Sequence, residues 1–242
     1  MEWKYTKENP LRVATLCAGY ESQCMALRNL GIPFDLVMWA EFDPESKKKL
    51  EDQPAVIAHN AVFPEYADRN WGDMTKIDWE KAPDFDLLFY STPCQSISNA
   101  GLQHGFAEGS GTRSSIIWNV RDAIKIKRPK YAILENVRAM VSKKFVGMFN
   151  LWQQELIKFG YTNFPEIINA KDQGIPQNRE RIFLVSTRED SWFNFPQPKE
   201  LKLRLRDLLE EKVDEKYYID DLKVAEFVSQ LEKKKLDMIC AD

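Results

Sequence analysis

The chain has 242 residues, 44% of them hydrophobic and 29% charged, a composition that excludes intrinsic disorder and predicts one large globular domain with a small appendage. No apolar stretch is long enough for a membrane span and no basic, then apolar, leader opens the chain, so we expect a cytoplasmic protein without membrane contact. The formal net charge is −3, from 34 basic and 37 acidic residues, so a polyanionic partner would need a local basic patch.

Cysteine and histidine usage argues against a metal protein. The four cysteines form no C-x-x-C pair, and the two histidines, His59 and His104, lie far apart in the chain. A zinc site needs ligands at close, repeated spacing, and a disulfide framework is typical of small secreted domains. We therefore expect neither.

Short apolar runs alternate along the chain with segments of helical periodicity. The runs predict strands at 12–16, 36–39, 87–90, 131–134, 166–168 and 182–185, and the segments between them predict helices near 21–30, 44–61, 113–127 and 144–159. This alternation predicts an α/β fold with a doubly wound, mostly parallel sheet. Ligands of such sheets bind beyond the carboxyl ends of the strands.

The composition changes near Pro198. Residues 199–242 contain 10 basic and 12 acidic residues, 22 of 44, against 29% charged residues in the whole chain. Four apolar residues there recur at helical spacing and predict a helix near 220–236. They are Val224, Phe227, Val228 and Leu231. We expect a domain over 1–198 and a charged, partly helical extension, whose apolar stripe packs on the domain or docks a partner.

A turn of small residues follows the first strand. It reads Cys17-Ala18-Gly19-Tyr20 and lets backbone N–H groups approach a ligand closely, although ordinary strand-to-helix turns have the same composition. Glu41, about 22 residues after Gly19, is placed to accept hydrogen bonds from ribose hydroxyls or to be a solvated strand end. Asp73 is placed to face an adenine amino group. The pattern favours a nucleoside-bearing cofactor, and the absence of G-x-G-x-x-G argues against a dinucleotide.

The most informative segment is Ser91-Thr92-Pro93-Cys94, just after the strand at 87–90. A cysteine on a constrained turn at the carboxyl edge of a sheet is placed to be a nucleophile, although buried free cysteines are common. Glu135 ends the strand that begins at 131 and can exchange a proton beside Cys94. Arg179 and Arg181, two residues apart in an extended segment, point to the same side and can position a planar base.

In order and spacing these residues resemble the motifs of the cytosine-5 methyltransferase family. Ala18-Gly19 resembles motif I, Glu41 motif II, Asp73 motif III, Pro93-Cys94-Gln95 motif IV, Glu135-Asn136-Val137 motif VI, and Gln177-x-Arg179-x-Arg181 motif VIII. Residues 111–115 resemble the end of the family's catalytic loop, where it enters motif V. The resemblance covers roughly residues 11–190. It implies the Rossmann-like fold of S-adenosylmethionine-dependent methyltransferases.

The resemblance implies S-adenosyl-L-methionine as the cofactor and S-adenosyl-L-homocysteine as its product. The cofactor-binding positions are Cys17, Ala18, Gly19, Tyr20, Glu41, Phe42, Asp73, Met74 and Pro93. By the same resemblance, Glu41 would hold the ribose, Asp73 would hold the adenine amino group, and Phe42 would stack on the adenine ring.

The resemblance also implies the chemistry. Cys94 would add to C6 of a cytosine flipped out of double-stranded DNA, and Glu135 would hold the N3/N4 edge of that base. Arg181, supported by Arg179, would contact the cytosine O2 and favour the Cys94 thiolate. The implied enzyme is of a prokaryotic or phage type, associated with restriction and modification, cytoplasmic, and bound to the nucleoid when on DNA; no metal is implied.

The sequence departs from the family pattern in two places. Cys17 and Glu21 stand where the family's motif I has a phenylalanine and its second glycine. No target recognition domain, motif IX or motif X is detectable after Pro198. We therefore expect the catalytic subunit of a split enzyme, or a piece of a longer one, with the recognition domain and motif X on a second subunit. The alternatives are a tRNA cytosine-5 methyltransferase, a catalytically idle regulatory homologue and a plain Rossmann oxidoreductase.

Overall fold

The computed structural model describes residues 5–98, 104–188, 192–218 and 221–239, with side chains of the last helix only over 222–232. The chain divides into two compact units, residues 1–201 and 202–242. The sequence places its change of composition at Pro198, three residues before this division. Cys240 lies outside the described residues.

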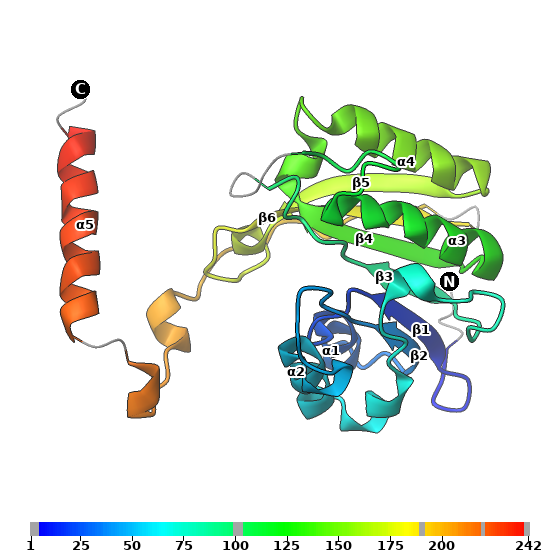
Figure 1. The fold of residues 1–242 in the computed structure, drawn as a ribbon, viewed down its shortest axis with the longest axis horizontal. Coiled ribbons are helices and arrows are strands. Elements are labelled where there is room, and N and C mark those ends of the chain that lie inside the picture. Colours follow the sequence, from blue (N-terminus) through cyan, green and yellow to red (C-terminus); the bar gives the residue numbers. More distant parts are fainter. Residues whose placement is uncertain (1–4, 99–103, 189–191, 219–220, 240–242) are drawn as a thin grey trace. The chain divides into compact units, whose positions relative to one another are not determined.

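The first unit is built on a six-stranded sheet with the strand order β2-β1-β3-β4-β6-β5 (Figure 1). Its strands are β1 (Leu11–Leu16), β2 (Phe34–Ala40), β3 (Leu87–Tyr90), β4 (Tyr131–Val137), β5 (Thr162–Asn169) and β6 (Glu180–Thr187). The first four strands pair in parallel, whereas β6 runs antiparallel to both β4 and β5. The predicted α/β fold with a doubly wound, mostly parallel sheet is confirmed. The sheet is mixed because β6 runs in the opposite direction.

The reversal of β6 has a local cause. Parallel neighbours need a crossover connection, usually a helix, whereas antiparallel neighbours need only a turn. Residues 170–179 between β5 and β6 contain just one short 3-10 turn, Ala170–Asp172. The chain therefore folds straight back beside β5, and the first residues of β6 reach the edge of the sheet where β4 ends.

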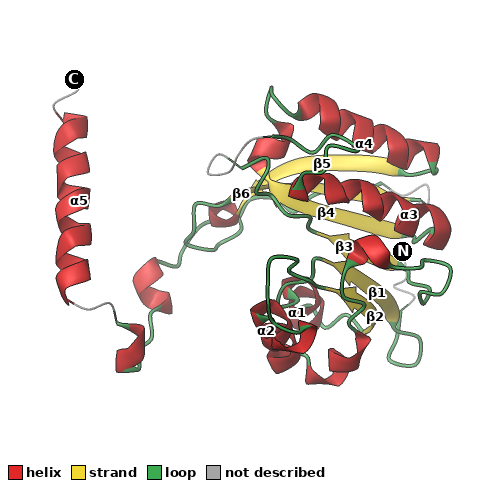
Figure 2. Ribbon diagram, viewed as in Figure 1, coloured by secondary structure: helices red, strands yellow, loops and turns green. Residues whose placement is uncertain are grey.

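Four helices cover the two faces of the sheet (Figure 2). They are α1 (Ser22–Asn29), α2 (Pro54–Val62), α3 (Ile117–Lys127) and α4 (Val146–Lys158). The larger core cluster joins the sheet to α3 and α4, with Trp152 fully buried and donating to the hydroxyl of Tyr90 at 3.1 Å. The smaller cluster joins the sheet to α1 and α2 and includes the buried Trp39.

The helix predicted over 44–61 is too long. The structure has a single 3-10 turn at Leu50–Asp52 and then α2, which begins at Pro54. Proline has no N–H to donate and its φ is preset, so it fits the first position of a helix and breaks one that would run through it. The helical periodicity before Pro54 was therefore misleading.

The second unit contains the helix predicted near 220–236, observed as α5 (Asp221–Ile239). The side chains of its apolar stripe are exposed, Phe227 at 60% and Leu231 at 49%. No helix within the described ranges is long and apolar enough to cross a membrane. Within the same ranges, no three His, Cys, Asp or Glu side chains gather closely enough to hold a metal ion.

Candidate active site

The turn between β1 and α1 is shaped by three residues with positive φ, namely Cys17 (55°), Gly19 (57°) and Glu21 (67°). Its backbone is tied to β2: the Ala18 N–H donates to the carbonyl of Ala40 at 3.2 Å, and the Gly19 N–H donates to Glu41 Oε2 at 2.8 Å. Apart from Gly19 itself and its two chain neighbours, no described atom lies within 4 Å of the position that a Cβ atom on Gly19 would occupy. A ligand can therefore approach the backbone closely at Gly19.

A cavity of about 290 Å³ opens beside this turn. It is lined by Cys17, Ala40, Glu41, Phe42, Asp43, Pro44, Gly72, Asp73, Met74, Thr75, Pro93, Arg113 and Ile116. Six of the nine predicted cofactor residues are among them. The other three, Ala18, Gly19 and Tyr20, line a larger neighbouring cavity of about 840 Å³, which also includes Cys17. The nine residues thus lie around two cavities that share one side chain.

Glu41 has the properties of a buried acceptor. Burial raises the pKa of its carboxyl group, and the hydrogen bonds from the N–H groups of Gly19 and Phe42 partly oppose this shift. Because one carboxylate oxygen bonds Gly19 while the side chain also lines the cavity, Glu41 can accept further hydrogen bonds from a ligand. The acceptor capacity of Glu41 beside the Gly19 backbone fits the hydroxyl groups of a nucleoside ribose.

Asp73 is already engaged at the start of a short 3-10 turn. Its Oδ1 accepts hydrogen bonds from the N–H of Thr75 at 3.0 Å and from its hydroxyl at 2.7 Å, and its Oδ2 pairs with Lys76 at 3.3 Å. Although partial burial opposes the change, these bonds hold the pKa of Asp73 below its usual value. Asp73 lines the cavity as an ionised acceptor with a fixed orientation.

Cys17 lies under the cavity rather than at a reactive edge. Its sulfur is 3.8 Å from the sulfur of Met74. Burial, together with the negative charge of Glu41, raises the pKa of the Cys17 thiol to about 12. The thiol is therefore a neutral packing group, which suits an apolar wall better than nucleophilic chemistry.

Glu135 has two partners at the carboxyl edge of the sheet. Leu134 pairs with Tyr90 in register, which brings the next residues, Glu135 and Ser91, side by side. The Ser91 hydroxyl donates to Glu135 Oε2 at 2.6 Å, and Arg181 pairs with Glu135 Oε1 at 3.0 Å. The two predicted catalytic residues Glu135 and Arg181 are therefore in direct contact.

The turn that carries Cys94 is fixed from two sides. The Asn136 amide donates to the carbonyl of Thr92 at 2.9 Å, and the Ser114 hydroxyl donates to the carbonyl of Pro93 at 2.6 Å. Ser114 also accepts from the N–H of Ser96 at 3.2 Å. Cys94 is a half-buried free thiol, packed in part against the main core.

Arg179 and Arg181 line the larger cavity together with Glu135. Arg179 precedes β6 and is exposed, whereas Arg181 is half-buried and bonded to Glu135. A third arginine, Arg138, pairs at 2.7 Å with Glu180, between the two. The antiparallel direction of β6 places this arginine pair beside the end of β4.

Three contributors could not be assigned from the sequence because their roles depend on contacts between segments that are far apart in the chain. Ser91 and Ser114 are ordinary in isolation, and only the β3 to β4 register reveals that Ser91 meets Glu135. Arg113 lines the smaller cavity and pairs with Asp43 at 3.6 Å and with Glu45 at 3.3 Å. For Arg113, the sequence indicated a functional role only through its position in the stretch that resembles the catalytic loop.

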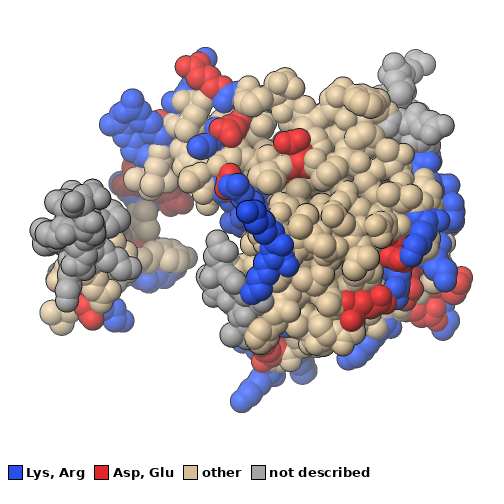
Figure 3. Space-filling view, turned by 90° about the horizontal axis from the view of Figure 1, so that it is seen from above, with Lys and Arg blue, Asp and Glu red and all other residues tan. Residues whose placement is uncertain are grey.

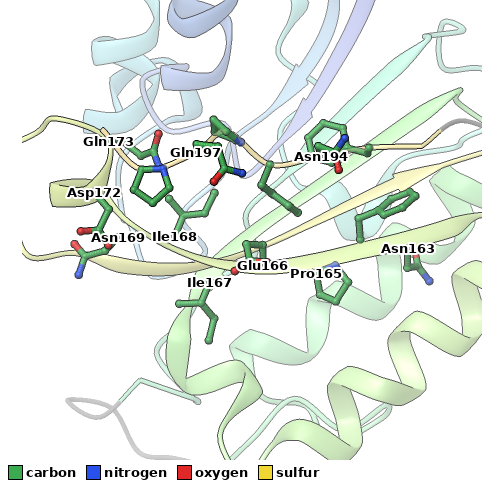
Figure 4. Close-up of a pocket in the computed structure, with 15 residues that line it drawn as sticks. Asn163, Pro165, Glu166, Ile167, Ile168, Asn169, Asp172, Gln173, Asn194 and Gln197 are labelled. Atoms are coloured by element: carbon green, nitrogen blue, oxygen red, sulfur yellow. The ribbon is translucent and has the colours of Figure 1, made fainter. Parts of the chain in front are cut away.

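Two further hollows lie away from the smaller cavity. One, of about 530 Å³, separates β5 from residues 193–198 and is lined by none of the predicted site residues (Figure 4). The other, of about 720 Å³, is lined by Ser98, Arg138, Glu180 and Arg181 among others, and so adjoins the catalytic edge. On the face seen in Figure 3, the described basic and acidic side chains are interspersed around a broad uncharged area.

Comparison with known proteins identifies close relatives. Residues 11–237 match the family model for C-5 cytosine-specific DNA methylase. The chain is 43% identical over 204 residues to the type II methyltransferase M2.ScrFI of Lactococcus lactis subsp. cremoris, a match that covers 83% of the chain and 54% of the relative. It is 33% identical over 256 residues to the orphan methyltransferase M.Rho11sI of Bacillus phage rho11s, covering 93% and 48%.

The chain thus spans about half the length of these curated relatives. Among solved structures, the S. pombe Dnmt2 methyltransferase has the same fold, with a TM-score of 0.66 at 20% identity. That match covers 91% of this chain and 66% of the other.

Proposed function

The chain belongs to the C-5 cytosine-specific DNA methylase family, and on this premise we propose that it is the catalytic part of a DNA cytosine-5 methyltransferase. It transfers a methyl group from S-adenosyl-L-methionine to C5 of a cytosine that has left the stack of double-stranded DNA. The contact of Glu135 with Ser91 and Arg181, beside the Cys94 turn, is the observation that carries this proposal. The protein acts in the cytoplasm, at the nucleoid.

The residues around the two cavities that share Cys17 would hold the cofactor. Glu41 would accept hydrogen bonds from the ribose hydroxyls, Asp73 would orient the adenine, and Phe42 would stack on the adenine ring. The proposal is supported by the open backbone at Gly19 and by the free acceptor capacity of Glu41. The bound cofactor supplies an electrophilic methyl group on a sulfonium sulfur.

The reaction begins at Cys94. Its thiolate forms a bond to C6 of the cytosine, and the electron pair of the C5–C6 bond moves toward C5 while Glu135 donates a hydrogen bond or proton at N3. C5 would then form a bond to the methyl carbon of the cofactor, whose S–CH3 bond would break and leave its electron pair on the sulfur of S-adenosyl-L-homocysteine. A base removes the C5 proton, the electron pair re-forms the C5–C6 double bond, and the C6–S bond breaks to release the Cys94 thiolate.

The arginines position the base and its charges. Arg181 holds Glu135 through an ion pair at Nε and donates from Nη1 to the carbonyl of Glu180 at 2.8 Å, so Nη2 is the group that we assign to the cytosine O2. Arg179 lines the same cavity and adds a second positive charge there.

A further element completes the enzyme, and we propose that a second polypeptide supplies it. The larger cavity exposes part of the sheet: Phe89, Ile133 and Phe183 are half-buried there, beside Leu30, which is 73% exposed. Such an apolar surface favours a covering element. We assign that element to a partner that also carries the target recognition domain and motif X.

The test is covalent trapping on DNA that contains 5-fluorocytosine, where fluorine at C5 blocks proton removal and holds the adduct. Wild-type chain with its partner and cofactor should form a denaturation-resistant DNA adduct, whereas Cys94→Ser should form none because a hydroxyl is a much poorer nucleophile at neutral pH. Cys240→Ser changes another thiol of the chain and should leave the adduct intact. A wild-type adduct through another residue would refute the assignment of Cys94.

A further inference from the structure

Glu21 is an unusual residue for its position. It immediately precedes α1 with a φ of 67°, and its side chain is completely buried. A left-handed conformation is unfavourable for a residue with a side chain, whereas glycine adopts it readily. Glu21 therefore combines an unfavourable backbone conformation with a buried acidic group, and favourable contacts must offset both.

Hydrogen bonds of Glu21 stabilise the turn between β1 and α1. Its Oε2 accepts a hydrogen bond from the Thr15 hydroxyl of β1 at 3.1 Å, and its N–H donates to the carbonyl of Ala18 at 3.0 Å. Its carbonyl accepts from the N–H of Met25 in α1 at 3.0 Å. Glu21 thus links the end of β1, the turn and the first turn of α1.

The other carboxylate oxygen, Oε1, is buried and has no hydrogen-bond partner among the described residues. Burial, with a contribution from the negative charge of Glu41, raises the pKa of Glu21 to about 7. The groups that face it are Thr15 on β1, Cys24 on α1 and Glu41 after β2; the pKa of Cys24 is itself raised by burial and by Glu21. No cation is among these neighbours.

We propose that Glu21 is a positioning residue for cofactor binding: its buried carboxyl group holds the turn so that the Gly19 N–H stays on Glu41, and a positively charged cofactor favours its ionised form. The inference rests on the proposed function, because it requires a sulfonium cofactor in the cavities above the turn. Glu41 is the link, since it bonds Gly19 and is electrostatically coupled to Glu21. Positive charge beside these two acids lowers the cost of ionising both.

The sign of the effect follows from linkage. If the cofactor binds the ionised form of Glu21 more tightly, its binding releases a proton from that group near neutral pH, and its affinity rises with pH through the same range. S-adenosyl-L-homocysteine has the same nucleoside but a neutral sulfur, so the effect should be smaller for it. A carboxyl group with only a structural role would not distinguish the two ligands.

The experiment is calorimetric titration of the chain with each ligand between pH 5.5 and 8.5, in two buffers of different ionisation enthalpy, to count protons released. The pH dependence of affinity in Glu21→Gln serves as the baseline, because it contains the titration of the ligand and that of Glu41. After this baseline is subtracted, wild-type affinity for S-adenosyl-L-methionine should rise up to tenfold across the pH range. Glu21→Gln should lose the proton release attributed to residue 21. Glu51→Gln, a change at an exposed acid, should match the wild type.

A second variant separates positioning from folding. Glu21→Gly removes the backbone strain, so its thermal unfolding temperature should not fall, but it also removes the hydrogen bond from Thr15 and should weaken binding of both ligands several-fold. Equal proton release in wild type and Glu21→Gln, or unchanged affinity in Glu21→Gly, would overturn the inference and leave the proposed function standing. If wild-type protein binds neither ligand, the proposed function itself fails. Should Glu21→Gln not fold, equal wild-type proton release for the two ligands would also overturn the inference.

Discussion

Glu135 is held by one neutral and one charged donor, Ser91 at 2.6 Å and Arg181 at 3.0 Å. In the proposed reaction it must present a proton to the cytosine N3 in the transition state, although both of its carboxylate oxygens already have a partner. The base must therefore displace or share these bonds when it enters.

Glu135→Gln should lower the rate of methyl transfer by roughly two to four powers of ten, the range for loss of a general acid or base. The amide keeps the shape of the side chain but cannot exchange a proton, so cofactor affinity should change little. Single-turnover transfer of a labelled methyl group, with the partner present, measures the rate, and calorimetry measures the affinity. An equal loss in both would instead indicate a structural carboxylate.

The buried carboxyl of Glu21 also makes stability depend on pH. Its pKa is raised from the ordinary 4.5 to about 7 in the folded chain, so the folded state keeps its proton to higher pH than the unfolded state. The free energy of unfolding should therefore fall between about pH 4.5 and 7, by roughly 3 kcal/mol at most, and then level off. Glu21→Gln should remove this decline. Urea unfolding at pH 5, 6, 7 and 8 checks it, and parallel curves for the two proteins would contradict it.

At the scale of elements, the Cys94 turn depends on Ser114, which lies 18 residues after Ser96 and approaches it across the fold. Ser114 is almost completely buried and serves two backbone groups, the carbonyl of Pro93 and the N–H of Ser96. The segment before α3 thus sets the geometry of the segment after β3.

Ser114→Ala should leave both backbone groups without their partner and cost about 1–3 kcal/mol of stability. It should also slow adduct formation, because the turn loses the bond that fixes Pro93 next to Cys94. Thermal unfolding and trapping on 5-fluorocytosine DNA measure the two effects. Ser115→Ala is a matched control, since the Ser115 hydroxyl donates to the nearby carbonyl of Thr112; equal trapping rates in the two variants would contradict the proposed role.

The sequence was sufficient to locate the strand ends that carry Glu41, Cys94 and Glu135, because apolar runs identify buried strands and parallel strands bring their carboxyl ends to one edge. It could not reveal the Ser91 to Glu135 bond, which depends on register between strands 44 residues apart. Nor could it reveal that Glu21 is buried, since its neighbours in sequence are polar or small. Local patterns report which face of an element is apolar, whereas polar partners are decided by tertiary packing.

At the scale of the whole molecule, the chain has an open apolar cavity beside the catalytic edge and a net charge of −3. Nonspecific affinity for DNA comes chiefly from basic groups that neutralise phosphates, and sequence is read by elements that reach the base edges. The described residues on the face in Figure 3 offer a mixture of charges rather than a continuous basic surface.

The purified chain alone should therefore transfer labelled methyl groups to DNA at least about 100-fold more slowly than the same chain with its recognition partner, because incomplete positioning costs about that much. Phe227→Glu, on the exposed stripe of α5, should weaken assembly with the partner, and Glu226→Gln should not. Filter binding of labelled DNA measures methyl transfer, and analytical ultracentrifugation measures assembly with the partner. Robust, site-specific labelling by the isolated chain would refute the requirement for a partner.

The position of β5 at the end of the sheet has a consequence for self-association. An exposed end strand is a template for pairing with another chain, and proline on such a strand interrupts that template. β5 carries Pro165, and its Phe164 packs against Trp192 and Phe193 of the segment across the hollow in Figure 4. At the opposite end, the N–H of Trp71 donates to the carbonyl of Trp39 in β2 at 2.8 Å. Both margins therefore resist edge-to-edge growth, which protects the protein from aggregation through its strands.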